Sequence, residues 1–300
     1  METDHTPVMQ DALFAHELRL AIGPARIEVR CNDPVFYGML EEWCGLFRTH
    51  GAPHYRLDIA LRHERSVAEI QRIIPTLHVH ARDGGFATDP PLWRAEYHPA
   101  TRCLRFETER EFFHPSIQPR FLNILLSSLY NSYCDEVTCG HREAYLVHGC
   151  GVALDERAFL FTGPSGAGKT TIAGLAPEHT VMNDEVVLVR VRDRAVEIAG
   201  TPLLGGINRR SLTAAPLAAV FVLRHGPEPS LRVVEPREAY PRFLSQVFDL
   251  APVMSSGTGR MRWLEQRMDL AGAVLDRLPC YELTFRPDDS FWPVIRALDL

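Results

Sequence analysis

Gly163-Pro164-Ser165-Gly166-Ala167-Gly168-Lys169-Thr170-Thr171 is the stretch that decides the fold of this 300-residue chain. It fits the pattern G-x-x-x-x-G-K-[ST]. The apolar run Arg157–Thr162 precedes it and a short helical segment, Thr170–Leu175, follows it. In such a loop, glycines let backbone N–H groups converge on one point, and the start of the helix adds partial positive charge. The pattern predicts a phosphate-binding loop between a buried strand and a helix.

The lysine content of the chain supports this interpretation. Lys169 is the only lysine, and the other 31 of the 32 basic residues are arginine. From this composition, the chance of finding both glycines and the hydroxyl residue around one lysine is roughly 4 in 10,000. A compact ammonium fits a phosphate cradle, whereas a planar guanidinium does not. We therefore predict nucleotide binding by Gly163, Ser165, Gly166, Ala167, Gly168, Lys169, Thr170 and Thr171.

Charge and composition exclude several other classes of protein. The formal net charge of −6 offers no electrostatic surface for nucleic acid or anionic membranes. Residues 1–10 contain no apolar run of the secretory kind, and no stretch is long and apolar enough to span a bilayer. The seven cysteines are scattered and include no C-x-x-C pair. We expect a cytoplasmic globular protein with buried cysteines and without a nucleic-acid or membrane partner.

The two halves of the chain differ in charge and in sequence pattern, which predicts two domains, residues 1–143 and 144–300. The first has a charge balance of 15 − 20 = −5, and the second 17 − 18 = −1. In the first, Glu17–Cys31 alternates apolar and polar residues around a Gly-Pro turn, which predicts two strands. Asp33-Pro34 then predicts the start of a helix. With a further helix over Pro119–Tyr133 and strands over Tyr55–Leu61, Leu77–Ala81, Leu92–Tyr97 and Cys103–Glu107, residues 1–143 form a predicted α+β domain.

The histidines of the first domain permit a second hypothesis. His78 and His80 alternate and would share one face of a strand, where they could bind a metal together with His54, His63 and His98. No helical H-x-x-x-H and no carboxylate at a fixed spacing accompanies them. We expect ordinary surface or hydrogen-bonded histidines here.

In the second domain, two acidic residues follow the phosphate loop closely. Asp184 and Glu185 come 15 and 16 residues after Lys169, immediately before the apolar strand Val186–Val189. A transport ATPase needs a far longer separation and an L-S-G-G-Q signature. A GTPase needs a second lysine for N-K-x-D. Phosphoryl transfer needs a phosphate cradle, Mg²⁺, an orienting carboxylate and cations. The second domain offers a candidate for each.

These segments resemble HPr kinase/phosphorylase and its HPr-kinase-related relatives. The resemblance rests on Tyr145–His148, Gly149–Leu154, the glycine-rich loop, Asp184-Glu185 and Val196–Gly200. It implies a mixed-sheet kinase domain related to phosphoenolpyruvate carboxykinase. The loop pattern itself makes the Thr170 hydroxyl a ligand for Mg²⁺. The resemblance implies further site roles: Asp184 exchanges the proton of the attacking hydroxyl, Glu185 helps to hold Mg²⁺, His148 lies near the phosphates, and Glu197 binds a second metal or positions substrate.

Arginines complete the expected site. The resemblance places a substrate loop with Pro, Gly and Arg near Pro252–Arg260, which makes Arg260 the candidate cation for the transferring phosphate. Arg209 and Arg210, in a loop after Gly205-Gly206, are a second choice. An ordinary structural or surface role is the alternative for these acids, for His148 and for these arginines.

The sequence thus favours an ATP- and Mg²⁺-dependent kinase that phosphorylates a hydroxyl, with a serine of a small protein or peptide as the expected acceptor. Two alternatives stay open, a kinase for a small metabolite and a nucleotide-sensing module without turnover. Assembly into a homo-oligomer is possible in each case. Strands over Ala218–Leu223, Leu231–Val234 and Tyr281–Phe285 and helices over Glu238–Phe248 and Arg262–Asp276 are expected to complete the mixed sheet.

Overall fold

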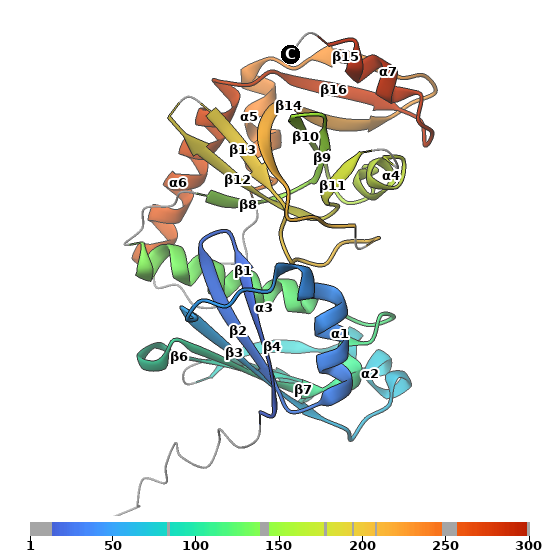
Figure 1. Cartoon of the computed structure of the whole chain (residues 1–300). Helices are drawn as coiled ribbons and strands as arrows, with labels where there is room; N and C mark the ends of the chain where they lie inside the picture. The colour runs from blue at the N-terminus through green and yellow to red at the C-terminus, as the bar shows by residue number, and fades with distance from the viewer. Residues whose placement is uncertain are drawn as a thin grey trace, which may run out of the picture. The chain divides into compact units, whose positions relative to one another are not determined.

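The computed structural model describes residues 14–82, 85–138, 144–176, 179–193, 195–207, 209–247 and 257–298. The chain forms two compact units, Met1–Tyr133 and Cys134–Leu300, and the sequence prediction had placed the boundary after residue 143. Each unit contains its own mixed β-sheet with helices, so the architecture is α/β (Figure 1).

In the first unit, seven strands of the described residues form one sheet in the order β1-β2-β3-β7-β6-β5-β4. The pairs β2-β3 and β3-β7 are parallel, and the other pairs are antiparallel. The elements are β1 (His16–Ile22), β2 (Ala25–Cys31), α1 (Pro34–Cys44), β3 (Tyr55–Arg62), α2 (Val67–Ile73), β4 (His78–Arg82), β5 (Gly85–Asp89), β6 (Arg94–His98), β7 (Cys103–Glu109) and α3 (Phe121–Ser132).

Local signals explain the start of this unit, and the predictions made from them are confirmed. β1 and β2 form the expected antiparallel pair, joined at Gly23, whose φ of 54° is a conformation that glycine adopts at little cost. The side chain of Asp33 caps α1 by accepting a hydrogen bond from the backbone N–H of Phe36 at 2.7 Å. Pro34 then occupies the first turn, where no intrahelical donor is needed.

The second unit is built on one larger sheet. Its path among the described residues runs β11-β9-β10-β14-β13-β12-β8, and β16 and β15 extend it beyond β14. The elements are β8 (Ala144–His148), β9 (Cys150–Leu154), β10 (Arg157–Thr162), α4 (Lys169–Gly174), β11 (Thr180–Asn183), β12 (Val186–Arg192), β13 (Ala195–Ala199), β14 (Ala214–His225), β15 (Ser230–Val233), α5 (Pro236–Leu244), α6 (Gly257–Leu275), β16 (Cys280–Phe285) and α7 (Phe291–Arg296).

The central strands of this sheet are buried on both faces. Alternate residues of β10 enter different cores: Leu160 packs in a cluster that includes α5 and α6, and Phe161 in a cluster with α4 and α7. β14 follows the same rule with Val220 and Phe221. A strand with helices on both sides must be apolar at successive positions. This explains why β10 and β14 have continuous apolar sequences.

Three parallel strands end at the same edge of the sheet. β10 pairs in parallel with β14, and β14 pairs in parallel with β16. The glycine-rich loop follows β10 there, close to His225 at the end of β14 and Phe285 at the end of β16. In open α/β sheets, ligands commonly bind outside the carboxyl ends of parallel strands.

Candidate active site

The glycine-rich loop, residues 163–168, connects β10 to α4 as the sequence predicted. Its three glycines all have positive φ, 151° at Gly163, 80° at Gly166 and 104° at Gly168. A Cβ atom on Gly168 would lie 2.4 Å from Cζ of Phe285, which leaves no space for a side chain. The predicted loop residues Ser165 and Gly166 are exposed at the tip of the loop, and Ala167 is buried beneath it.

Lys169 is buried at the first position of α4, with a side chain turned back under the loop. Its Nζ donates hydrogen bonds to the carbonyl oxygens of Gly163 at 2.7 Å and Pro164 at 3.0 Å. Burial lowers the pKa of the Lys169 ammonium, and the nearby Glu185 carboxylate opposes that change. Only 6% of the residue is exposed, so Lys169 is a buried charge held at the base of the loop.

A histidine from a neighbouring strand holds the tip of the loop. Nε2 of His225 lies 3.0 Å from the carbonyl oxygen of Gly166, an arrangement that makes Nε2 the donor. The His225 ring also packs against Phe285, with 5.2 Å between the ring centroids. Sequence analysis missed His225, because its contact with the loop arises from the parallel pairing of β14 with β10 and β16.

Asp184 is fully buried beside the start of α4. Its Oδ2 accepts hydrogen bonds from the backbone N–H groups of Gly206 at 2.7 Å and Ile207 at 3.0 Å. Its Oδ1 is also buried, and no donor among the described residues bonds to it. Buried carboxylate oxygens normally have partners. Oδ1 is therefore an acceptor available to a group that enters the site.

Two glycines leave room for the side chain of Asp184, and one of them also lies beside Thr170. A Cβ atom on Gly205 would lie 1.8 Å from Oδ1 of Asp184. On Gly206 it would lie 3.0 Å from Oγ1 of Thr170 and 3.4 Å from Oδ2 of Asp184. The Thr170 hydroxyl and the Asp184 carboxylate therefore border the same glycine. Thr171, also predicted to bind nucleotide, lies half-buried in the first turn of α4.

Asn183 organises the backbone around these acids. Its Oδ1 accepts hydrogen bonds from the backbone N–H groups of Glu185 at 2.7 Å and Val186 at 2.9 Å. Its Nδ2 donates to the carbonyl oxygens of Thr201 and Leu203. The side chain thus ties the turn between β11 and β12 to the segment that leads to Gly205. Its only sequence signal was its position before the acidic pair.

Glu185 and His148 form a second pair in this region. The Nδ1 atom of His148 lies 3.7 Å from Oε1 of Glu185, and both side chains are about four-fifths buried. The pair arises from strand register, since β8 and β12 place His148 opposite Val186. The structure thus brings Glu185 near His148 and within electrostatic range of Lys169.

The arginines after Gly206 bond to the protein backbone. Arg209 donates to the carbonyl oxygens of Ala173 at 2.6 Å and Ala176 at 3.1 Å, at the end of α4. The positive charge of the guanidinium thereby stabilises the C-terminus of the helix, where the backbone carbonyl groups lack intrahelical donors. Arg210 donates to the carbonyl oxygen of Pro202 at 3.1 Å. Arg209 therefore holds the helix that begins with Lys169.

Glu197 is not brought to the acidic pair. It lies on β13 opposite Arg190 of β12, with Oε2 of Glu197 at 2.6 Å from Nη2 of Arg190. Arg190 is four residues beyond Val186, which is about 13 Å along a strand. Strand register thus separates Glu197 from Glu185. The side chain of Arg260, the predicted phosphate-contacting arginine in α6, lies outside the described residues.

Other sequence expectations concern metals, membranes and cysteines. Within the described ranges, no three His, Cys, Asp or Glu residues are grouped so as to hold a metal. No helix in that part of the chain is long and apolar enough to cross a bilayer. Six cysteines are described and all are buried thiols, while Cys139 lies outside the described residues. Burial raises the pKa of Cys31, Cys103 and Cys280 to about 11.

Comparison with known proteins adds a distant similarity in structure. No family model matches the chain, and no curated protein matches it. Among solved structures, the Hpr(Ser) kinase/phosphatase from Coxiella burnetii matches with a TM-score of 0.26 and 11% sequence identity. The match covers 50% of this chain and 90% of that one. The function proposed below rests on the residues of the site itself.

Proposed function

We propose that this protein is an ATP- and Mg²⁺-dependent phosphotransferase that phosphorylates a hydroxyl group. One observation carries the proposal: a glycine-rich loop with a buried lysine adjoins a buried carboxylate that has an available oxygen. Lys169 supplies the cation, and Asp184 Oδ1 supplies the acceptor.

The residues of the loop fit the phosphates of a nucleotide. The positive φ values at Gly163, Gly166 and Gly168 allow backbone N–H groups to face a common point. The first N–H groups of α4 have no intrahelical partner, and the helix start carries partial positive charge. Lys169 would exchange its bonds to the Gly163 and Pro164 carbonyls for bonds to phosphate oxygens. The loop thus supports nucleotide binding without a large rearrangement of the backbone.

The oxygen donors beside the loop fit Mg²⁺. This cation prefers hydroxyl, carboxylate and water oxygens. The Thr170 hydroxyl borders Gly206 together with Asp184, and Glu185 follows Asp184 directly. Thr170 and Glu185 would hold the cation, whose charge neutralises phosphate oxygens during transfer. Glu197 is not part of this proposal, because its carboxylate pairs with Arg190.

Asp184 is the proposed base. Gly206 and Ile207 hold its Oδ2 through two backbone N–H groups, which fixes the orientation of the carboxylate. Oδ1 then accepts the proton of the attacking hydroxyl. Gly205 leaves room for this carboxylate, because a Cβ atom there would lie 1.8 Å from Oδ1. His148, paired with Glu185, is placed to orient that second acid.

We further propose that the acceptor is a serine of a small protein or peptide. The support is the resemblance of the loop, of Asp184-Glu185 and of residues 196–200 to HPr-kinase-related proteins. A small-metabolite hydroxyl and a sensing role without turnover are the alternatives that experiment must separate.

The test combines nucleotide binding with transfer from labelled ATP. We expect wild-type protein to bind ATP and to transfer label, with Mg²⁺ present, to a serine-containing protein or peptide. Asp184→Asn should bind ATP but lose transfer by at least 100-fold, and Lys169→Ala should weaken both ATP binding and transfer. Asp155→Asn is the matched control, because Asp155 is exposed in a turn of the same unit with φ of 56°, which asparagine adopts readily.

The outcomes separate the candidate functions. Transfer unaffected by Asp184→Asn contradicts the mechanism. Transfer to small hydroxyl compounds, but not to proteins or peptides, selects the metabolite alternative. Tight ATP binding without hydrolysis or transfer selects the sensing module.

A further inference from the structure

His225 contacts the glycine-rich loop from a neighbouring strand, and the proposed chemistry assigns it no role. It is the last residue of β14, which lies between β10 and β16 in the sheet. Both neighbours run parallel to β14, so the three strands end at the edge where the loop begins. Strand order therefore brings a side chain that is 59 residues beyond Gly166 to the tip of the loop.

Three contacts fix the position of the His225 ring. Nε2 lies 3.0 Å from the carbonyl oxygen of Gly166. The ring packs against Phe285 with 5.2 Å between the centroids, and strand register places these two residues opposite each other. A Cβ atom on Gly168 would lie 3.2 Å from Cε1 of His225, so the ring also lies against this glycine. His225 thus contacts the loop at two of its glycines.

A path of hydrogen bonds connects His225 to Lys169 through the loop. The carbonyl of Gly166, which accepts from His225, belongs to the same planar peptide group as the N–H of Ala167. That N–H donates to the carbonyl oxygen of Pro164 at 3.1 Å. The same carbonyl oxygen accepts a hydrogen bond from Nζ of Lys169 at 3.0 Å. A single peptide group therefore lies between the histidine and one of the two acceptors of the lysine.

This peptide group has little other support. Gly166 is exposed, with a φ of 80°, and a Cβ atom on it would meet no atom within 4 Å. A glycine in open space has many accessible conformations. Among the described residues, none other than His225 donates to the Gly166 carbonyl. The hydrogen bond from His225 therefore restricts the rotation of the peptide group at the tip of the loop.

The contact needs a donor and does not need a charge. A carbonyl oxygen only accepts, so Nε2 of His225 must carry a proton. The charged ring always has that proton, and the neutral ring has it in one of its two tautomers. A neutral donor at the same place should therefore replace the histidine.

We propose that His225 is a positioning residue of the glycine-rich loop. Its Nε2 donor holds the peptide group between Gly166 and Ala167 and, through the Pro164 carbonyl, keeps Lys169 at the base of the loop. The side chain acts on the loop and not on the reacting atoms. The consequence for ATP rests on the proposed function, whereas the effect on the loop itself does not.

The first experiment measures amide hydrogen exchange of residues 163–168 in the full chain without nucleotide. His225→Phe keeps an aromatic ring beside Phe285 but removes the donor, and we expect exchange at least threefold faster than in wild type. His225→Gln offers an amide N–H at nearly the same distance from the backbone as Nε2, so its exchange should stay within twofold of wild type. Rescue by glutamine distinguishes a hydrogen-bond donor from a ring that only fills space.

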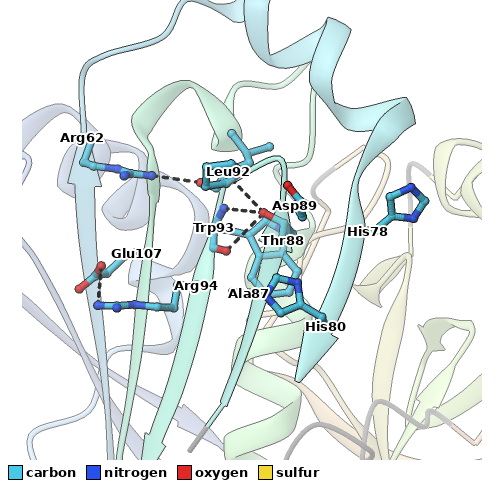
Figure 2. A pocket seen from close by; sticks show the side chains of 11 residues that line it. Arg62, His78, His80, Ala87, Thr88, Asp89, Leu92, Trp93, Arg94 and Glu107 are labelled. Atoms are coloured by element: carbon cyan, nitrogen blue, oxygen red, sulfur yellow. Dashed lines mark hydrogen bonds and ion pairs between the residues drawn. The ribbon is translucent and has the colours of Figure 1, made fainter. Parts of the chain in front are cut away.

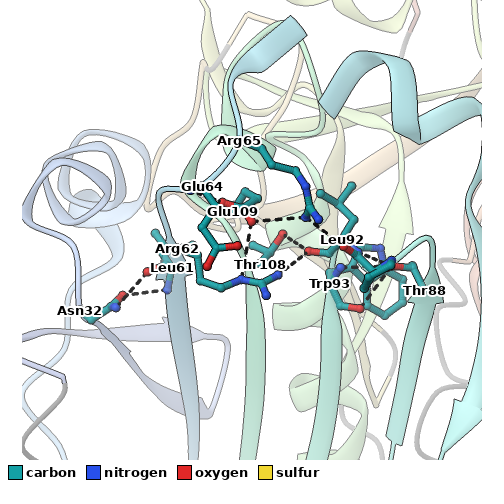
Figure 3. A network of polar contacts seen from close by, with 11 residues as sticks. Asn32, Leu61, Arg62, Glu64, Arg65, Thr88, Leu92, Trp93, Thr108 and Glu109 are labelled. Carbon is teal, nitrogen blue, oxygen red and sulfur yellow. Dashed lines mark hydrogen bonds and ion pairs between the residues drawn. The ribbon is translucent and has the colours of Figure 1, made fainter. Parts of the chain in front are cut away.

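Two matched controls lie in the first unit. His80→Phe replaces an exposed histidine that lines a cavity of about 750 Å³ and forms no hydrogen bond with the other lining residues (Figure 2). Thr108→Val removes a side-chain donor to the carbonyl oxygen of Leu92 at 3.2 Å, while Arg62 still donates to that oxygen (Figure 3). Neither control should alter exchange in the loop, because both residues belong to the other compact unit.

The second experiment is calorimetric titration with ATP and Mg²⁺. A neutral hydrogen bond contributes modestly, so His225→Phe should weaken ATP binding about threefold to tenfold. His225→Gln and both controls should bind ATP within twofold of wild type. Thermal unfolding of each variant establishes that it is folded.

The outcomes decide the two proposals separately. Equal loop exchange in wild type and His225→Phe overturns this inference, as does equal acceleration in His225→Phe and His225→Gln. Equal ATP affinity of wild type and His225→Phe overturns it as well. A wild-type protein that binds no ATP contradicts the proposed function alone, because loop exchange still decides whether His225 holds the loop.

Discussion

The ammonium of Lys169 donates a hydrogen bond of 2.7 Å to the carbonyl oxygen of Gly163, six residues earlier in the chain. A second bond, of 3.0 Å, reaches the carbonyl oxygen of Pro164. The only lysine of the protein is thus satisfied by its own loop and is buried there. The first two predictions follow from this relationship.

Replacement of Lys169 should impair nucleotide binding. Charge-assisted hydrogen bonds contribute about 1.5–3 kcal/mol, so Lys169→Ala should weaken ATP binding roughly tenfold to hundredfold. Lys169→Arg should not restore it, because a planar guanidinium does not fit the buried position of a compact ammonium. Calorimetric titration with ATP checks both. Wild-type affinity in Lys169→Arg would contradict the steric argument.

Nucleotide binding should weaken at alkaline pH. Burial lowers the pKa of Lys169 below the ordinary value of 10.5, so the ammonium loses its proton at a lower pH than an exposed lysine would. ATP affinity should therefore fall as the pH rises through this lowered pKa. The effect of pH on folding stability runs in the opposite direction. Between the lowered pKa and 10.5, the unfolded chain binds more protons at Lys169 than the folded chain does. This difference makes folding more favourable as the pH rises through that window. ATP titrations at increasing pH measure the effect, and Lys169→Ala should lack it.

Gly205→Ala should be destabilising. The new Cβ would lie 1.8 Å from Oδ1 and 2.3 Å from Cγ of Asp184, a fully buried side chain. Overpacking of this kind costs about 1–3 kcal/mol, and displacement of Asp184 should also reduce transfer. Gly174→Ala, in α4, is the control, because its Cβ would meet no atom within 4 Å. Urea unfolding should show a loss for Gly205→Ala and a change of less than about 1 kcal/mol for Gly174→Ala.

Arg209→Ala should destabilise the end of α4. The substitution removes the donors to the carbonyl oxygens of Ala173, Ala176 and His179. The expected cost is about 1–3 kcal/mol, because those carbonyls lose a charged partner in a partly buried place. Arg224→Ala, which removes an exposed arginine with a single contact of 3.4 Å to Glu282, should cost far less. Equal losses of stability in the two variants would refute the capping role of Arg209.

The free energy of unfolding should decrease in acid, because the carboxylate of Glu282 becomes protonated there. Burial opposes ionisation of this carboxyl, but hydrogen bonds from Arg232 and Arg242 lower its pKa below 4.5. The contribution of ionised Glu282 to folding stability is therefore complete above pH 4.5, and it is lost as the pH falls through the lowered pKa. Glu282→Gln should lower the free energy of unfolding by about 1–2 kcal/mol at neutral pH, a modest value because solvent screens the partly exposed arginines that bind Glu282. Glu228→Gln, at an exposed position, is the control, and chemical unfolding across the acid range gives the comparison.

Much of the fold could be predicted because its signals are local. The caps and turns around β1, β2 and α1 lie within a few residues of the elements that they define. β5 and α7 escaped prediction. α2 also did, although Ser66 and Glu69 form a capping box that was a readable signal. These elements are five to seven residues long, and short segments depend on packing more than on propensity.

The sequence alone determined the glycine-rich loop between β10 and α4. Strand, glycines, lysine and helix are contiguous, so their geometry follows from local conformation. Tertiary structure decided which distant residues join the loop. Asp184 receives its donors from Gly206 and Ile207, 22 and 23 residues later, and Glu197 is held opposite Arg190 by strand register. A shift of one residue in pairing reverses the face on which a side chain lies, and nothing local specifies that pairing.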